Sequence, residues 1–119
     1  MNSFRFENFE IWILASEISN ELFDIADKLL DQKKYRLSEQ LFGAALSITN
    51  NIAEGSGSNS NKDFANFLNI SRRSVFECAN MLSIMQQRNY ITNETKVFLF
   101  EKLQILSKMI TNFRKSLLN

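Results

Sequence analysis

Apolar residues recur at alternating steps of three and four in four long stretches of this chain, and the chain contains no proline. The first stretch extends from Ile11 to Leu29, with an apolar residue at every step. Heptad spacing of this kind predicts amphipathic helices that pack almost parallel to one another. Because proline would interrupt a helix, its absence allows each helix to run its full length. No stretch shows the sustained alternation that is typical of a β-strand.

The spacing predicts four helices, which cover residues 8–31, 36–54, 61–89 and 94–117. Either Ser60 or Asn61 can cap the start of the third helix, and either Thr92 or Asn93 can cap the fourth. Short polar turns join the helices, so consecutive helices must be antiparallel. The sequence therefore predicts a single all-α domain over residues 1–119, built as an antiparallel up-down-up-down four-helix bundle.

Two of the three glycines, Gly55 and Gly57, mark the clearest break in the helical pattern. Glycine adopts positive φ without steric cost, so we predict that Gly55 ends the second helix and that Gly57 turns the chain, forming a hinge. We expect Asn50, Asn51 and Glu54 to organise this helix end through hydrogen bonds. A functional carboxylate at Glu54 is the alternative.

Two single residues inside the predicted helices receive structural interpretations. Gly43 costs the second helix about 1 kcal/mol relative to alanine, so we predict that close packing of another helix requires it. Cys78, the only cysteine, falls within an apolar stripe and is predicted to be a buried hydrophobic residue, with a reactive thiol as the alternative.

The sequence contains no histidine and a single cysteine, which removes the usual general base and a thiolate metal cluster. The glycine-rich segment 55–58 lacks the lysine and the preceding strand of a phosphate-binding loop. We therefore expect no catalytic residue, no cofactor, no metal and no small-molecule substrate, so that the protein is not an enzyme. The chain shows no signal segment and no membrane-spanning apolar run, which predicts a cytoplasmic protein without a membrane partner.

Charge is distributed unevenly along the chain, although the net charge is only +1. Residues 1–31 carry seven acids and two bases, whereas residues 32–119 carry six acids and twelve bases. In the first predicted helix an acidic residue recurs every seven positions, at Glu10, Glu17, Asp24 and Asp31. Such an asymmetry can complement itself within the fold or between copies of the chain.

Four basic residues in the third predicted helix are candidate contacts to nucleic acid: Lys62, Arg72, Arg73 and Arg88. Arginine can bind phosphate through two parallel hydrogen bonds, which favours the Arg72–Arg73 pair. A solvated helix face, or pairing with the acidic first helix, explains the same residues as well. Strong binding would need several of these contacts together.

Eleven phenylalanines are more than the core of one small bundle requires, so some of them are predicted to face a partner chain. Large aromatic side chains dominate the energetics of protein interfaces. We therefore predict that four aromatic residues anchor a subunit interface: Trp12, Phe42, Phe76 and Phe98.

Several motifs, in a fixed order, resemble a known family of four-helix bundle proteins. The most specific is Ala-Ala-x-Ser-Ile-x-x-Asn-Ile-Ala-Glu-Gly, which matches at every fixed position. The matching segments are Phe6–Trp12, Leu37–Leu41, Ala44–Gly55 and Asp63–Ile70, followed by Ser74 and Glu77. Over nearly its whole length the chain is similar to the 23S rRNA intervening-sequence proteins and to the accessory variability proteins of diversity-generating retroelements.

The resemblance implies a compact bundle that assembles as a ring-like homopentamer without known enzymatic activity, and whose relatives in some cases bind nucleic acid and a reverse transcriptase. Phe42–Gly43 and Ser58 stand where relatives often carry basic residues, and Ser71–Ser74 adds two arginines to a pattern of small residues. We predict a non-enzymatic homo-oligomer that presents a surface to a macromolecular partner. The alternative is an accessory protein that binds RNA weakly and with low specificity.

Overall fold

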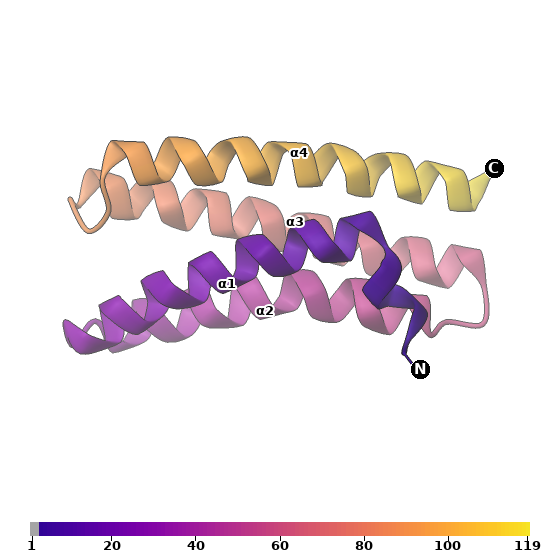
Figure 1. The fold of residues 1–119 in the computed structure, drawn as a ribbon, viewed down its shortest axis with the longest axis horizontal. Coiled ribbons are helices and arrows are strands. Elements are labelled where there is room, and N and C mark those ends of the chain that lie inside the picture. Colours follow the sequence, from indigo (N-terminus) through magenta and orange to yellow (C-terminus); the bar gives the residue numbers. More distant parts are fainter. Residues whose placement is uncertain (1–2) are drawn as a thin grey trace.

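The computed structural model describes residues 3–119 as one short helix followed by four long helices. They are the 3-10 helix η1 (Arg5–Asn8) and the α-helices α1 (Glu10–Asp31), α2 (Tyr35–Ser56), α3 (Asn61–Gln87) and α4 (Asn93–Leu118). Each α-helix spans the length of the molecule, and consecutive helices run in opposite directions (Figure 1). Residues 3–119 contain no strand, and the predicted all-α, four-helix fold is confirmed.

The predicted starts of the third and fourth helices are confirmed, and a side chain caps each of them. Ser60 Oγ accepts the amide of Asp63 at the start of α3, and Thr92 Oγ1 accepts the amide of Thr95 at the start of α4, both at 3.1 Å. The first helix starts later than predicted, because the extended backbone of Phe9 (φ −76°, ψ 130°) separates η1 from α1. The polar caps were therefore better guides to helix starts than the apolar pattern.

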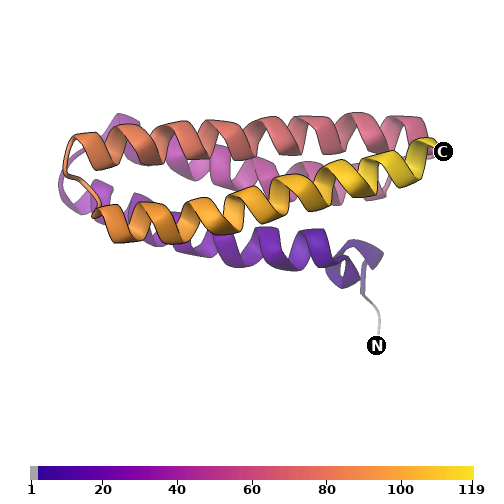
Figure 2. The same ribbon diagram turned by 90° about the horizontal axis from the view of Figure 1, so that it is seen from above.

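The four α-helices surround one apolar core. α1 packs on α2, α2 on α3 and α3 on α4, while α4 returns to α1 through the sparsest contacts of the four pairs (Figure 2). The predicted heptad seams supply most of the core. Its largest fully buried side chains are Ile18, Leu22, Leu29, Leu41, Ile48, Ile52, Leu68, Leu82, Met85, Leu99, Leu103 and Leu106.

Buried serines join α1, α2 and α3 within this core. The hydroxyl of Ser19 on α1 donates to the carbonyl of Ala45 on α2 at 2.9 Å. Ser71 on α3 donates in the same way to the carbonyl of Ile48 on α2 at 2.7 Å. Because each hydroxyl is satisfied by the backbone of the facing helix, it can be buried at little cost while the two helices approach closely.

The predicted backbone conformation of the glycine hinge is wrong. α2 continues through Ser56, Gly55 is buried, and none of the three glycines has a positive φ. Gly55 is needed for space, because an added Cβ would lie 2.8 Å from both Phe64 Cδ1 and Phe67 Cβ on α3. The prediction of close packing at Gly43 is also wrong, since no atom would lie within 4 Å of a Cβ there.

Positive φ occurs instead at two residues that are not glycines. Lys33 (φ 63°) follows α1 and Asn89 (φ 61°) follows α3. At both sites the amide of the next residue donates to the carbonyl five positions earlier, at 2.9 and 2.8 Å. This is the Schellman arrangement that often ends helices, usually with glycine at the left-handed position.

Candidate interaction surfaces

The side chains of Asn51, Ser47 and Ser74 form a hydrogen-bonded chain between α2 and α3. Asn51 Nδ2 donates to the carbonyl of Ser47 at 2.8 Å and to Ser47 Oγ at 3.0 Å. Ser47 Oγ lies 2.8 Å from Ser74 Oγ, and Ser74 Oγ donates to the carbonyl of Ile70 at 3.2 Å. Since each hydroxyl has one proton, Ser47 donates to Ser74. This chain of hydrogen bonds therefore joins the two helices.

Asn50 and Glu54, predicted to organise the end of α2, are exposed. Within residues 3–119 neither side chain has a hydrogen bond or an ion pair, whereas the backbone carbonyl of Glu54 accepts the amide of Gly57 at 3.1 Å. A carboxylate without a neighbouring base or ligand set does not make a catalytic site. The hydrogen bonds near this helix end come from Asn51, from the backbone and from two other side chains: Ser56 Oγ donates to the carbonyl of Ala53 at 2.7 Å, and the Arg5 guanidinium donates to the carbonyl of Ser56 at 2.9 and 3.2 Å.

The four candidate nucleic-acid contacts do not gather at one place. Lys62 and Arg88 lie at opposite ends of α3, roughly 39 Å apart along its axis. Arg72 lies midway, with its guanidinium 4.9 Å from the centre of the Phe76 ring, and Arg73 is exposed. The structure therefore separates these residues into different surfaces.

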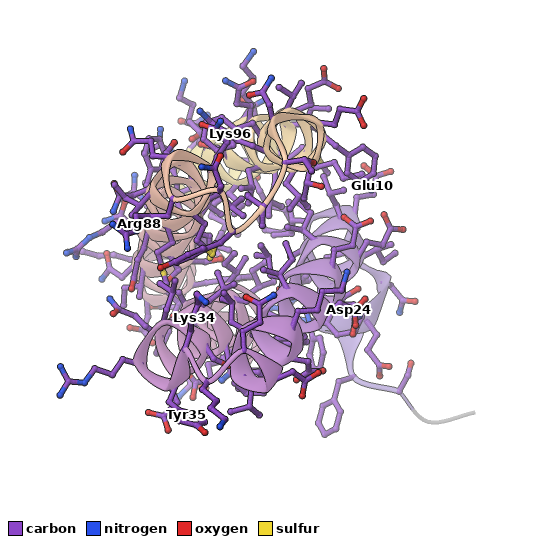
Figure 3. The ribbon with its side chains drawn as sticks, turned by 90° about the vertical axis from the view of Figure 1, so that its left-hand side faces the viewer. Glu10, Asp24, Lys34, Tyr35, Arg88 and Lys96 are labelled. Atoms are coloured by element: carbon purple, nitrogen blue, oxygen red, sulfur yellow. The ribbon has the colours of Figure 1, made fainter. Side chains whose placement is uncertain are left out.

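Arg88 instead contacts Tyr90, which Lys34 from the other turn at the same end of the bundle also contacts. Its Nη2 donates to the hydroxyl of Tyr90 at 3.4 Å, and Lys34 Nζ lies 4.6 Å from the centre of the Tyr90 ring. Figure 3 views this end and shows Lys34, Tyr35 and Arg88 there. A depression of about 420 Å³ is lined by Lys33, Lys34, Tyr35, Arg36, Leu37 and Tyr90. We call these residues, with Arg88, the basic end.

The positive charges of the basic end change the pKa of Tyr90. The hydrogen bond from Arg88, together with the positive charges of Arg88 and Lys34, lowers the pKa of Tyr90. Sequence reasoning missed this cluster because Lys34 and Arg88 are far apart in the chain. The signal that could have found it is topological, since the first and third turns of an antiparallel bundle lie at the same end.

A basic, apolar groove lies between α3 and α4. It is a cavity of about 510 Å³ that includes Arg72, Phe76, Phe100 and Lys108, and no acidic residue lines it. Phe76 is 56% exposed. Lys96 Nζ lies 5.2 Å from the centre of the Phe100 ring, which adds a third positive charge. We call this surface the basic face.

An acidic groove lies on the other side of α4, between α4 and α1. It has a volume of about 550 Å³ and is lined by Glu21, Asp24, Ile25, Lys28, Glu94, Thr95, Phe98 and Leu99. Lys102 Nζ lies 3.7 Å from Glu21 Oε1 and 4.3 Å from the centre of the Phe98 ring. We call this surface the acidic face.

The four predicted interface aromatics lie in three different settings. Phe76 and Phe98 are about half exposed, in the basic face and the acidic face respectively. Phe42 is 45% exposed on α2 and its ring centre lies 4.7 Å from that of Phe23 on α1. Trp12 is half-buried and packs edge-on against Phe6. Only the first two line the grooves that flank α4.

Comparison with known proteins gives the family. The sequence model of the family described as 23S rRNA-intervening sequence protein matches residues 7–112. The chain belongs to this family. A crystal structure of a protein of unknown function, from the S23 ribosomal protein family of Bacteroides thetaiotaomicron VPI-5482, has the same fold: the TM-score is 0.84 at 24% identity, covering 88% of this chain and 98% of that chain. No curated protein matches.

This member of the 23S rRNA-intervening sequence protein family has no cluster of three or more acidic or cysteine side chains, among residues 3–119, that could hold a metal ion. Burial, with a smaller effect from the charge of Glu77, raises the pKa of the Cys78 thiol to about 12. The thiol therefore stays protonated and unreactive at neutral pH. In the described part of the chain, no helix combines the length and the apolar character needed to span a bilayer.

Proposed function

We propose that this protein is a non-enzymatic helical scaffold that assembles as a ring-like homopentamer and presents a surface to a macromolecular partner. The observation that carries the proposal is the exposed apolar surface of the bundle. Thirteen large hydrophobic side chains are more than a third exposed. Two of them, Phe76 and Phe98, each line a groove beside α4, and apolar surface gathered in this way is typical of interaction sites. The family resemblance supports five copies.

The chemistry of the chain supports a scaffold more than an enzyme. The sequence has no histidine, and its one thiol is buried with a raised pKa. The exposed Glu54 has no base within reach among the described residues. A single free, buried cysteine fits a reducing compartment such as the cytoplasm.

Light scattering coupled to size-exclusion chromatography tests the assembly. At tens of micromolar chain, we expect a particle mass about five times the 13.8 kDa of one chain. A mass of one chain under these conditions would overturn the proposal of self-assembly. Another stable multiple would keep the assembly and correct the number of copies.

We propose weak RNA binding at the basic end as a second function. The observation that favours it is the arrangement of Lys34 and Arg88 around the ring of Tyr90, beside Lys33 and Arg36. Cationic side chains bind the phosphate backbone, and four of them gather here around one depression. This site replaces the dispersed set on α3 as the place where such contacts converge.

Fluorescence anisotropy with a labelled structured RNA at low salt tests this second function. The double variant Lys34→Gln/Arg88→Gln is expected to weaken binding by about tenfold and to reduce its salt dependence. Lys115→Gln is the matched control, because Lys115 is an exposed base in the last turn of α4, and that end of α4 lies away from the turn that precedes it. No binding by the unaltered protein at low salt, or equal losses in both variants, would rule out RNA contact at the basic end.

A further inference from the structure

We propose that copies of this chain assemble head to tail, with the acidic face of one copy packed against the basic face of the next. This inference rests on the proposed self-assembly and names the surfaces that carry it. The contact is heterologous, since each copy offers one face of each kind. Four observations support it: complementary charge, unpaired buried polar atoms, a matching register and the weak burial of α4.

Charge is the first observation. Three acids, Glu21, Asp24 and Glu94, and one base, Lys28, line the acidic face, whereas Arg72 and Lys108 are the only charged residues that line the basic face. The acidic face also extends along α1. Glu17 and Glu10 lie one and two heptads before Asp24, on the same side of the helix, and Figure 3 shows Glu10 and Asp24 on the outer flank of α1. Opposite potentials of this kind favour contact between unlike faces over contact between like ones.

Unpaired polar atoms are the second observation. Among residues 3–119 three buried side-chain nitrogen or oxygen atoms lack a hydrogen-bond partner, and two of them are Glu21 Oε2 and Arg72 Nε. One lies in the acidic face and the other in the basic face. Because both atoms are covered by the chain itself, a neighbouring copy could pair with them only after the side chains of Glu21 and Arg72 change rotamer, a change that the cost of an unpaired buried polar group favours.

The register of the two faces is the third observation. Glu21 meets Lys102, and because α1 and α4 are antiparallel, Glu17 lies level with residue 106 of α4. Lys108 is two residues further, roughly 3 Å along the axis, and it lines the same groove as Arg72. A rotation about an axis parallel to the bundle therefore brings Glu17 of one copy to the height of Lys108 and Arg72 of the next.

The burial of α4 is the fourth observation. Only four of its 26 residues are buried, whereas ten of the 27 residues of α3 are buried. α4 also has the most exposed large hydrophobic side chains of the four helices, namely Val97, Phe98, Ile105 and Leu118. Because α4 borders both faces, a neighbouring copy on each side would cover it.

The position of the two faces limits how many copies can close a ring. α4 contacts α1 on one side and α3 on the other, so the faces share α4 as a common corner (Figure 2). In a bundle of square cross-section such faces meet at roughly a right angle, which closes a ring of about four or five copies. α4 then lies nearest to the ring axis and α2 farthest from it.

A charge-reversal cycle read by light scattering and sedimentation tests the pairing. Glu17 and Lys108 are exposed, and neither is in an ion pair within the described residues. Glu17→Lys alone places like charges opposite each other, and so does Lys108→Glu alone, so each should weaken self-association by about tenfold or more. The double variant restores opposite charges at every contact and should return to within about threefold of the unaltered chain. Glu39→Lys on α2 is the matched control and should assemble normally.

The outcomes separate this inference from the proposal on which it rests. A chain that is monomeric without any substitution overturns both. An oligomer that Glu17→Lys and Lys108→Glu leave intact keeps self-assembly and overturns the two faces. Two weakened single variants whose combination stays dissociated overturn the pairing of one face with the other. Circular dichroism of each variant shows that the helices are still folded, so that dissociation cannot be mistaken for unfolding.

Discussion

The α2–α3 contact and the α1–α4 contact differ in how closely two antiparallel helices pack. We call the first the tight side of the bundle and the second the open side. Between α2 and α3, Gly55 removes a side chain where Phe64 approaches, and Ser71 donates to the backbone of α2. Between α1 and α4 there is an open groove, crossed by one long ion pair of 3.7 Å. The first contact holds the bundle together, whereas the second leaves polar and aromatic groups available to another molecule.

The difference shows what the family motif specifies. The segment Ala44–Gly55 supplies the tight side of the bundle, including Ser47, Asn51 and Gly55. None of the residues that line the two grooves beside α4 belongs to that segment. A match to the motif therefore identifies the fold, while interaction chemistry is set by residues outside it.

The largest expected effect on stability comes from a substitution that disrupts the tight side. Gly55→Val adds three carbons where one Cβ would already lie 2.8 Å from two atoms of α3, and such overpacking should lower the free energy of unfolding by about 3 kcal/mol. Urea unfolding followed by circular dichroism measures the loss. Gly43→Val is the matched control on the same helix, where a Cβ meets nothing within 4 Å, and should change stability by less than about 1 kcal/mol.

The second effect concerns the hydrogen-bonded chain between α2 and α3. Ser74→Ala leaves the proton of Ser47 without its acceptor and should cost about 1 kcal/mol in the free energy of unfolding. The double variant Ser47→Ala/Ser74→Ala should cost less than the sum of the two single losses, because the two hydroxyls act together. Strictly additive losses in this cycle would contradict the bond between them.

Apolar spacing was sufficient to predict the four helices and most of the core, because helix periodicity is local. It failed where a neighbour determines the conformation. Gly55 continues α2 and leaves room for α3, whereas positive φ falls on Lys33 and Asn89, of which only asparagine is a residue type that often adopts it. The candidate site was harder to predict than the fold, because the basic end brings together Lys34 and Arg88 from two turns that are distant in the sequence. The acidic groove depends on the sparse contact between α1 and α4, and the basic groove on how α3 packs against α4; side-chain packing determines both.

The smallest expected effect tests the open side. Glu21→Gln removes the ion pair with Lys102, whose two side chains are 39% and 29% exposed, and a pair in that environment contributes little. At concentrations where the chain is monomeric, the free energy of unfolding should change by less than about 0.5 kcal/mol. At higher concentration the same variant should associate more weakly, because in the proposed assembly the charge it removes faces the next copy. A loss of stability as large as that of Ser74→Ala, in the monomer, would show that the α1–α4 contact holds the bundle as the α2–α3 contact does.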